Sequence, residues 1–102
     1  MWVRISTLRG QPGVTEEEGQ QNVEMARTQL LPALRQMDGF GGLMIAADPD
    51  TGESLTMTFW NNAEALEASV EAANRMRDEA ADQMGGNIAD VRTYQVFLNE
   101  TP

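Results

Sequence analysis

The chain has 102 residues, a formal net charge of −9 and 41% hydrophobic residues, and it contains neither cysteine nor histidine. All seven of its basic residues are arginines. This composition excludes disulfides, cysteine-held metals, a histidine base or haem ligand, and Schiff-base chemistry on a lysine. The excess of negative charge argues against nucleic acid and anionic membranes as partners, because both bind clustered cations.

The length is typical of one compact unit, so we expect a single domain over residues 1–102. The longest apolar run, residues 43–47, is far too short to span a bilayer. The first ten residues alternate like a strand and lack the apolar segment of a signal peptide. We therefore expect a cytoplasmic protein.

The chain begins with a predicted strand and a predicted helix. Residues 2–8 alternate in polarity, which is typical of a strand, and "GQPG" at residues 10–13 ends it. Thr15 and Glu18 form a capping box that predicts the start of the helix. Pro32 predicts either a kink in this helix or a restart with the proline in the first turn.

Two further strands are predicted to form a hairpin. Gly39 is expected to end the first helix in the left-handed conformation. Residues 41–48 and 54–60 then read as strands, and the short turn between them contains proline and glycine. This spacing indicates an antiparallel pair.

The last third of the chain reads as a helix and a strand. Asn61 and Glu64 form a second cap pair, and an apolar stripe continues from there to Met84. Gly85 and Gly86 are expected to end this helix. Residues 91–98 predict a fourth strand.

This order of elements predicts the fold class. Strand, helix, strand, strand, helix, strand with two right-handed crossovers gives an α+β ferredoxin-like βαββαβ sandwich with an antiparallel sheet. Both helices then cover one face of the sheet, yet two strands are apolar on both faces. Residues 43–47 belong to the second strand, and the fourth carries Val91, Tyr94, Val96, Phe97 and Leu98. We therefore expect a homodimer whose second copy covers the open face.

The stretch "GFGGLMIAADPDTGESLTMTFWNNAEALEAS", residues 39–69, resembles the centre of the antibiotic biosynthesis monooxygenase-like (ABM) domain family, a group of dimeric α+β barrels. The likeness lies in the glycine-rich start of the second strand, the acidic turn, the tryptophan that ends the third strand and the polar cap after it. "LLPALRQMDGF" resembles the end of the first helix of that family. The resemblance covers nearly the whole chain. It implies the fold and the dimer, and an activity that is cofactor-free oxygenation, haem degradation or unassigned.

The resemblance implies a site at Trp60. In oxygenases of the family a tryptophan at this strand end lines a pocket between sheet and helices, where a flat aromatic compound can stack on it. A tryptophan at such a junction can equally plug the end of the sandwich, with its indole N–H bonded to a nearby carbonyl. Both interpretations bury the side chain.

Arg4, Arg92 and Tyr94 complete the candidate catalytic set with Trp60. An arginine in mid-strand is uncommon unless it faces a pocket, a carboxylate or a subunit boundary. Arg92 and Tyr94 are two residues apart and share a face of their strand. The residues could form one cluster that holds a substrate anion. A salt bridge at the dimer interface explains the two arginines about as well.

We expect no haem, flavin or metal. The resemblance implies that haem-degrading members bind the iron through a histidine. This chain has no histidine, and Tyr94 is the remaining candidate ligand. The acidic turn at Asp48, Asp50 and Glu53 lacks the ligand count of a calcium loop and reads as a solvated hairpin tip.

Two classes of function remain. The first is a cofactor-independent monooxygenase that acts on a small phenolic or polycyclic aromatic compound. The second is a non-catalytic homodimer that binds a small ligand or serves as a structural dimerisation domain. The missing histidine, cysteine and lysine weigh against the enzyme, because the remaining groups are weak bases unless strongly perturbed.

Overall fold

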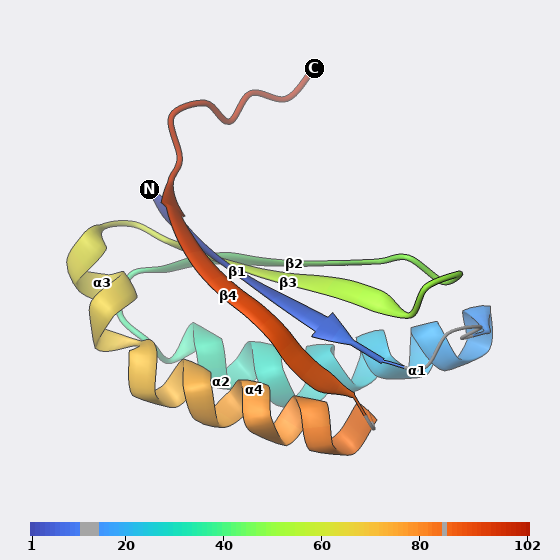
Figure 1. Cartoon of the computed structure of the whole chain (residues 1–102). Helices are drawn as coiled ribbons and strands as arrows, with labels where there is room; N and C mark the ends of the chain where they lie inside the picture. Colours follow the sequence, from blue (N-terminus) through green and yellow to red (C-terminus); the bar gives the residue numbers. More distant parts are fainter. Residues whose placement is uncertain (11–14, 85) are drawn as a thin grey trace.

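The computed structural model describes residues 1–10, 15–84 and 86–102. It contains a four-stranded sheet of order β2-β3-β1-β4 in which every paired strand is antiparallel. The strands are β1 (Trp2–Arg9), β2 (Phe40–Ala47), β3 (Glu53–Trp60) and β4 (Asn87–Gln95). All the helices lie on one side of this sheet (Figure 1). The predicted ferredoxin-like α+β fold is confirmed.

The first helical segment is interrupted by a wider turn. It consists of α1 (Glu16–Met25), the π-helix η1 (Ala26–Leu30) and α2 (Leu31–Arg35). The hydroxyl of Thr15 accepts a hydrogen bond from the Glu18 N–H at 3.1 Å, as the capping box predicts. Pro32 has no N–H and its ring crowds the preceding turn, so the chain widens before it. The segment then restarts with Pro32 in the first turn of α2, as predicted.

The second helical segment differs from the single helix that was predicted. It is divided at Ser69 into α3 (Ala63–Ala68) and α4 (Val70–Met84). Its cap is Asn62 and not Asn61, because the Asn61 N–H still bonds to the Gly39 carbonyl at 2.8 Å. The Asn62 side chain therefore accepts from the Ala65 N–H, at 2.8 Å.

The last strand also lies elsewhere than predicted. β4 begins four residues before Val91 and ends at Gln95, which pairs with Trp2 at the start of β1. Beyond that point β1 offers no further partner, and Val96 makes one bond to the Met1 carbonyl. Phe97 and Leu98 lie outside the sheet, with 88% and 74% of their surface exposed. They cannot supply the two-sided apolar strand that the sequence suggested.

Two predicted breaks fall partly outside the described residues. Of the break at residues 10–13 only Gly10 is described, and of the pair that ends the second helix only Gly86. Gly39 has the predicted positive φ, at 77°.

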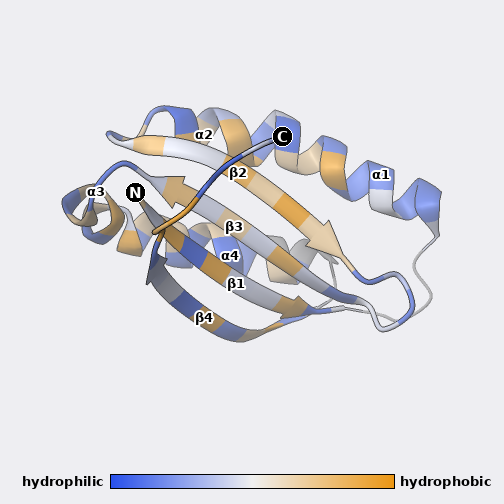
Figure 2. Cartoon of the chain, turned by 90° about the horizontal axis from the view of Figure 1, so that it is seen from above, coloured by the Kyte–Doolittle hydropathy of each residue, from blue (hydrophilic) through white to orange (hydrophobic). Residues whose placement is uncertain are grey.

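The core lies between β3 and the helices. Its buried centre is formed by Leu34, Trp60 and Leu66, and partly buried side chains pack around them. Toward the far end of the sheet the helix layer packs less closely: α1 has no buried residue. Seen from above, the strands of the sheet carry hydrophobic residues interspersed with polar ones (Figure 2).

We predict that Gly39→Ala lowers the free energy of unfolding by about 1–3 kcal/mol, because an added Cβ would collide with the Ala65 side chain and φ is positive. Gly19→Ala is the matched control. Its Cβ would meet nothing within 4 Å inside α1, so we expect it to stabilise the protein by about 0.5–1 kcal/mol. Urea unfolding monitored by tryptophan fluorescence measures both. Equal effects of the two substitutions would contradict the packing at Gly39.

Candidate functional site

Arg4 is the buried cation of this molecule. It lies in the middle of β1, faces the helices, and has only 5% of its surface exposed. Its Nη1 donates to Ser69 Oγ and its Nη2 to the Leu66 carbonyl, both at 3.0 Å. Ser69 Oγ itself donates to the Leu66 carbonyl at 2.6 Å. The guanidinium thus bonds β1 to the junction between α3 and α4.

The charge of Arg4 has no carboxylate beside it. Within residues 1–10, 15–84 and 86–102, the salt bridges involve other arginines. Burial lowers the pKa of Arg4, and the positive charge of Arg77 lowers it further. The Arg4 Cζ lies 5.9 Å from the centroid of the Trp60 ring, a distance at which a ring face attracts a cation. A buried, unpaired charge of this kind is costly, and such perturbed groups cluster at functional sites.

Trp60 is completely enclosed, with 0% of its surface exposed. Its Nε1 donates to Thr58 Oγ1 at 3.0 Å, and Phe40 packs edge-on against it with ring centroids 5.7 Å apart. The partner of the indole N–H is therefore a hydroxyl and not the carbonyl that the sequence suggested. The indole has no free face in this structure. This arrangement favours a packing role for Trp60 at the end of the sandwich over a role as the wall of a pocket. Stacking of a ligand on Trp60 would require the neighbouring side chains to move.

Arg92 and Tyr94 lie on the other side of the sheet. Arg4 pairs with Thr93 across β1 and β4, whereas Arg92 pairs with Ile5. Side chains at adjacent positions of a strand point to opposite faces, so Arg4 and Trp60 are separated from Arg92 and Tyr94 by the sheet. The predicted single cluster is not formed. The catalytic role of each residue stays a prediction.

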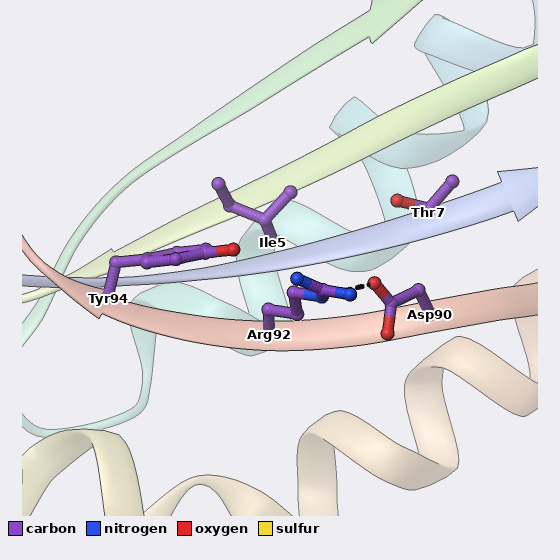
Figure 3. A pocket seen from close by; sticks show the side chains of 5 residues that line it. All are labelled: Ile5, Thr7, Asp90, Arg92 and Tyr94. Carbon is purple, nitrogen blue, oxygen red and sulfur yellow. Dashed lines mark hydrogen bonds and ion pairs between the residues drawn. The ribbon is translucent and has the colours of Figure 1, made fainter.

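Arg92 and Tyr94 instead line an open hollow of about 260 Å³ together with Ile5, Thr7 and Asp90 (Figure 3). Arg92 Nε lies 2.6 Å from Asp90 Oδ2. Hydrogen bonding to Tyr94, and then to Asp90, raises the pKa of Arg92. This cation is exposed and already paired, so it differs in kind from Arg4.

Sequence reasoning missed Ser69 and Arg77 as neighbours of Arg4. Ser69 reads as one polar position in a long helix, and its role follows from the break between α3 and α4. Arg77 reads as part of the solvated face of the same helix. The signal that could have found them is the serine itself, which is a poor residue for a helix interior and a good one for a helix junction.

The described part of the chain offers no group of three acidic side chains that could hold a metal ion. Asp48 Oδ1 accepts from the Asp50 N–H at 2.9 Å, which is a turn-stabilising contact. Tyr94, the remaining candidate for iron, lies on the face away from the helices, so the residues present do not fit a haem pocket between sheet and helices. No helix in the described ranges is long and apolar enough to cross a membrane.

We predict that Arg4→Met changes the free energy of unfolding by no more than about 1 kcal/mol, because an apolar side chain removes a buried charge at little cost. The Leu66 carbonyl keeps its bond to Ser69 in this variant. Thr58→Val is the contrasting change. It leaves the enclosed indole N–H without an acceptor and should cost about 1–3 kcal/mol. Urea unfolding measures both, and a loss of several kcal/mol in Arg4→Met would make Arg4 a structural residue.

Comparison with known proteins gives relatives in sequence but no matching family model. Rv2558, an uncharacterized protein of Mycobacterium tuberculosis strain H37Rv, is 31% identical over 98 residues, which are 96% of this chain and 39% of that protein. Rv2557 of the same strain is 29% identical over 89 residues, 87% of this chain and 38% of that protein. The chain spans about two fifths of the length of these curated relatives.

Solved structures are similar over the whole chain. The ActVA-Orf6 monooxygenase of Streptomyces coelicolor, in complex with nanaomycin D, has a TM-score of 0.73 at 15% identity and covers 99% of this chain and 91% of its own. A candidate antibiotic biosynthesis monooxygenase of Deinococcus radiodurans has 0.67 at 16%, with 100% and 98% covered. The heme-degrader MhuD of M. tuberculosis, with two hemes in its active site, has 0.64 at 18%, with 99% and 100% covered. The chain therefore has the fold of the antibiotic biosynthesis monooxygenase domain proteins.

Proposed function

We propose that this chain is a cofactor-independent monooxygenase that acts on a small phenolic or polycyclic aromatic compound held between the sheet and the helices. The observation that carries the proposal is the buried guanidinium of Arg4, which has no carboxylate partner in the described residues and lies against Trp60. Fixed positive charge in a dry site stabilises a developing anion far better than water does. The fold, shared with monooxygenases, agrees with this reaction class but does not establish it.

The chemistry requires an electron-rich substrate. An anthrone-like compound loses a proton to water, and its anion supplies the electrons that reduce O₂. One oxygen atom becomes the new carbonyl oxygen of a quinone, and the other leaves as water with the two hydrogens of the substrate methylene. The role of Arg4 is to lower the energy of the substrate anion and of the reduced oxygen. Trp60 acts through Arg4 and positions its guanidinium.

The helix-facing side of the sheet next to Arg4 supports this placement of the substrate. Ile45, Thr56, Ser6 and Val91 form one row across the strands, two residues from Arg4 along β1. Ile45 and Val91 each keep 38% of their surface exposed although they point to the helix side. Val23 of α1, on the helix layer, keeps 43% exposed. These apolar side chains offer surface to a ligand ring.

We infer a homodimer from the opposite face. Met44 and Tyr94 there are 54% and 46% exposed, and the half-buried Met57 pairs with both Ile5 and Met44. A contiguous apolar face of this kind is normally covered in a soluble protein. A second copy with the same face, packed sheet against sheet, is the simplest cover.

The alternative function is a non-catalytic homodimer that binds a small ligand or serves only for dimerisation. One observation favours it. Trp60 is completely enclosed, so the end of the sandwich is filled with side chains where the enzyme would need a pocket wall. The absence of histidine also leaves no ready base for proton removal.

Oxygen uptake with anthrone-like and quinol substrates tests the enzyme. We expect Arg4→Gln to lower kcat/KM by about 100-fold or more, because enzymes lose about this much activity when a preorganised group that stabilises an anion is removed. Arg27→Gln removes the same charge from an exposed position of the helix layer, where Arg27 pairs with Glu24, and should leave the rate within about twofold. Trp60→Phe should fall between them, because the aromatic face is kept and the bond to Thr58 is lost. No oxygen uptake above the protein-free rate with any substrate would refute the activity.

Sedimentation at micromolar concentration tests the dimer. The wild-type protein should have about twice the 11.2 kDa mass of the chain. Met57→Arg places a charge in the middle of the open sheet face and should yield monomers. Val70→Arg, on the exposed side of α4, is the control and should leave the mass unchanged. A folded wild-type monomer would refute the interface.

A further inference from the structure

We propose that Arg4 is the centre of a carboxylate-binding site on the helix-facing side of β1 and β4, and that its ligand is a small aromatic acid. This inference rests on the proposed placement of a ligand between sheet and helices and adds the chemical group that the ligand must carry.

One edge of the Arg4 guanidinium remains free for such a group. Nη1 donates to Ser69 Oγ and Nη2 to the Leu66 carbonyl, and these two acceptors are joined by a hydrogen bond. Both acceptors therefore lie at the edge of the guanidinium that Nη1 and Nη2 form. The other edge is formed by Nε–H and the second N–H of Nη2. No residue in the described ranges accepts a hydrogen bond from Nε. Two parallel N–H groups on one edge fit the two oxygens of a carboxylate.

A second cation adds positive potential at the same place. Arg77 of α4 is half-buried, and its charge is close enough to lower the pKa of Arg4. Its Nη2 bonds to Asn74 Oδ1, a neutral acceptor. The exposed Asp78 is the acidic group near it. Two guanidinium groups with one exposed carboxylate leave a local excess of positive charge in a chain whose net charge is −9.

The path to Arg4 passes the outer strand. Thr93 pairs with Arg4 across β1 and β4, points to the same face and is exposed. The backbone of β1 at Arg4 therefore lies next to an exposed position of β4, the strand that α4 flanks (Figure 1). In the proposed site the carboxylate approaches Arg4 from this side.

The neighbouring surface selects an aromatic ring. Ser6 and Val91 form the next pair on this face, at about 7 Å from the Arg4 and Thr93 pair by strand geometry. Val91 is 38% exposed, so its apolar side chain offers a surface on which the ring of such an acid can pack. The requirement for an acid and a ring together distinguishes this ligand from inorganic anions.

Titration with three naphthalenes of similar shape tests the site. The probes are 2-naphthoate, its neutral amide 2-naphthamide, and 2-naphthol, with dissociation constants measured by calorimetry. We expect 2-naphthoate to bind the wild-type protein at least about tenfold more tightly than the amide or the naphthol, because neither of these carries a negative charge or two acceptor oxygens for the two parallel N–H groups. The Nε–H resonance of Arg4, identified by its loss in Arg4→Lys, should shift only with the acid.

Variants separate the site from general charge effects. Arg4→Gln should weaken 2-naphthoate binding by about tenfold or more. Arg27→Gln, with the same change in net charge at an exposed helical position, should bind as the wild type does, and Arg77→Gln should lie between. If Arg4→Gln does not fold, the wild-type comparison of acid with amide and the Nε shift decide the matter alone.

The inference is overturned if the acid and the amide bind equally, if the naphthol binds most tightly, if Arg27→Gln weakens binding as Arg4→Gln does, or if no probe binds at millimolar concentration. Arg4 would then serve only to cap the carbonyl end of α3. Selective binding of the acid without oxygen uptake by any substrate would uphold the site and refute the oxygenase. Oxygen uptake without a preference for acids would do the reverse.

Discussion

One hydrogen-bonded charge connects the two layers of this small sandwich. The Arg4 side chain extends from the middle of the central strand β1 to the C-terminal end of α3. There its guanidinium donates hydrogen bonds to Ser69 Oγ and to the Leu66 carbonyl. A chain of 102 residues buries a modest core, and this long side chain bridges its sheet and helices; because its charge is buried, it orients the two layers while adding little to their stability. The break between α3 and α4 occurs at the residue that binds this guanidinium.

Trp60 depends on the same arrangement. It ends β3 directly opposite Trp2 and Phe40, so the widest side chains of three strands meet at one end of the sheet. The Thr58 hydroxyl satisfies the indole N–H, and the Arg4 guanidinium lies over the ring. The other end of the sheet carries Arg9, Glu53 and Asn87, and α1 has no buried residue. The molecule thus has a filled end and a more open end, and Arg4 lies between them.

The order of elements could be predicted from the sequence because each element has its own local signal. The alternation in β1, the capping box at Thr15 and Pro32 in α2 are each read within a few residues. The pairing of strands is not local. Whether Arg4 shares a face with Arg92 or with Thr93 depends on the register of β1 and β4, which a bulge between Thr7 and Leu8 shifts by one residue. A shift of one residue reverses the face of every side chain, and for this reason the sequence alone could not tell that Arg4 and Arg92 lie on opposite faces.

The boundaries of β4 and of the second helix depended on partners far along the chain. β4 ends where β1 begins, and the cap is Asn62 because the Asn61 N–H bonds to Gly39, 22 positions earlier in the chain. Local propensity cannot report such contacts. The family resemblance supplied the fold and the tryptophan at the strand end, but not which residues surround it.

The two outer strands of the sheet have opposite characters. β4 carries Asp90 and Arg92 along its free edge, and charges there discourage another strand from pairing with it. β2, with the sequence FGGLMIAA, has no charged residue, and its other edge is equally without a partner in the sheet. Its free backbone N–H and C=O groups form a template on which a further strand could add. Misassembly of a destabilised chain would therefore begin along β2, and an acidic substitution on that strand would be the natural means of suppressing it.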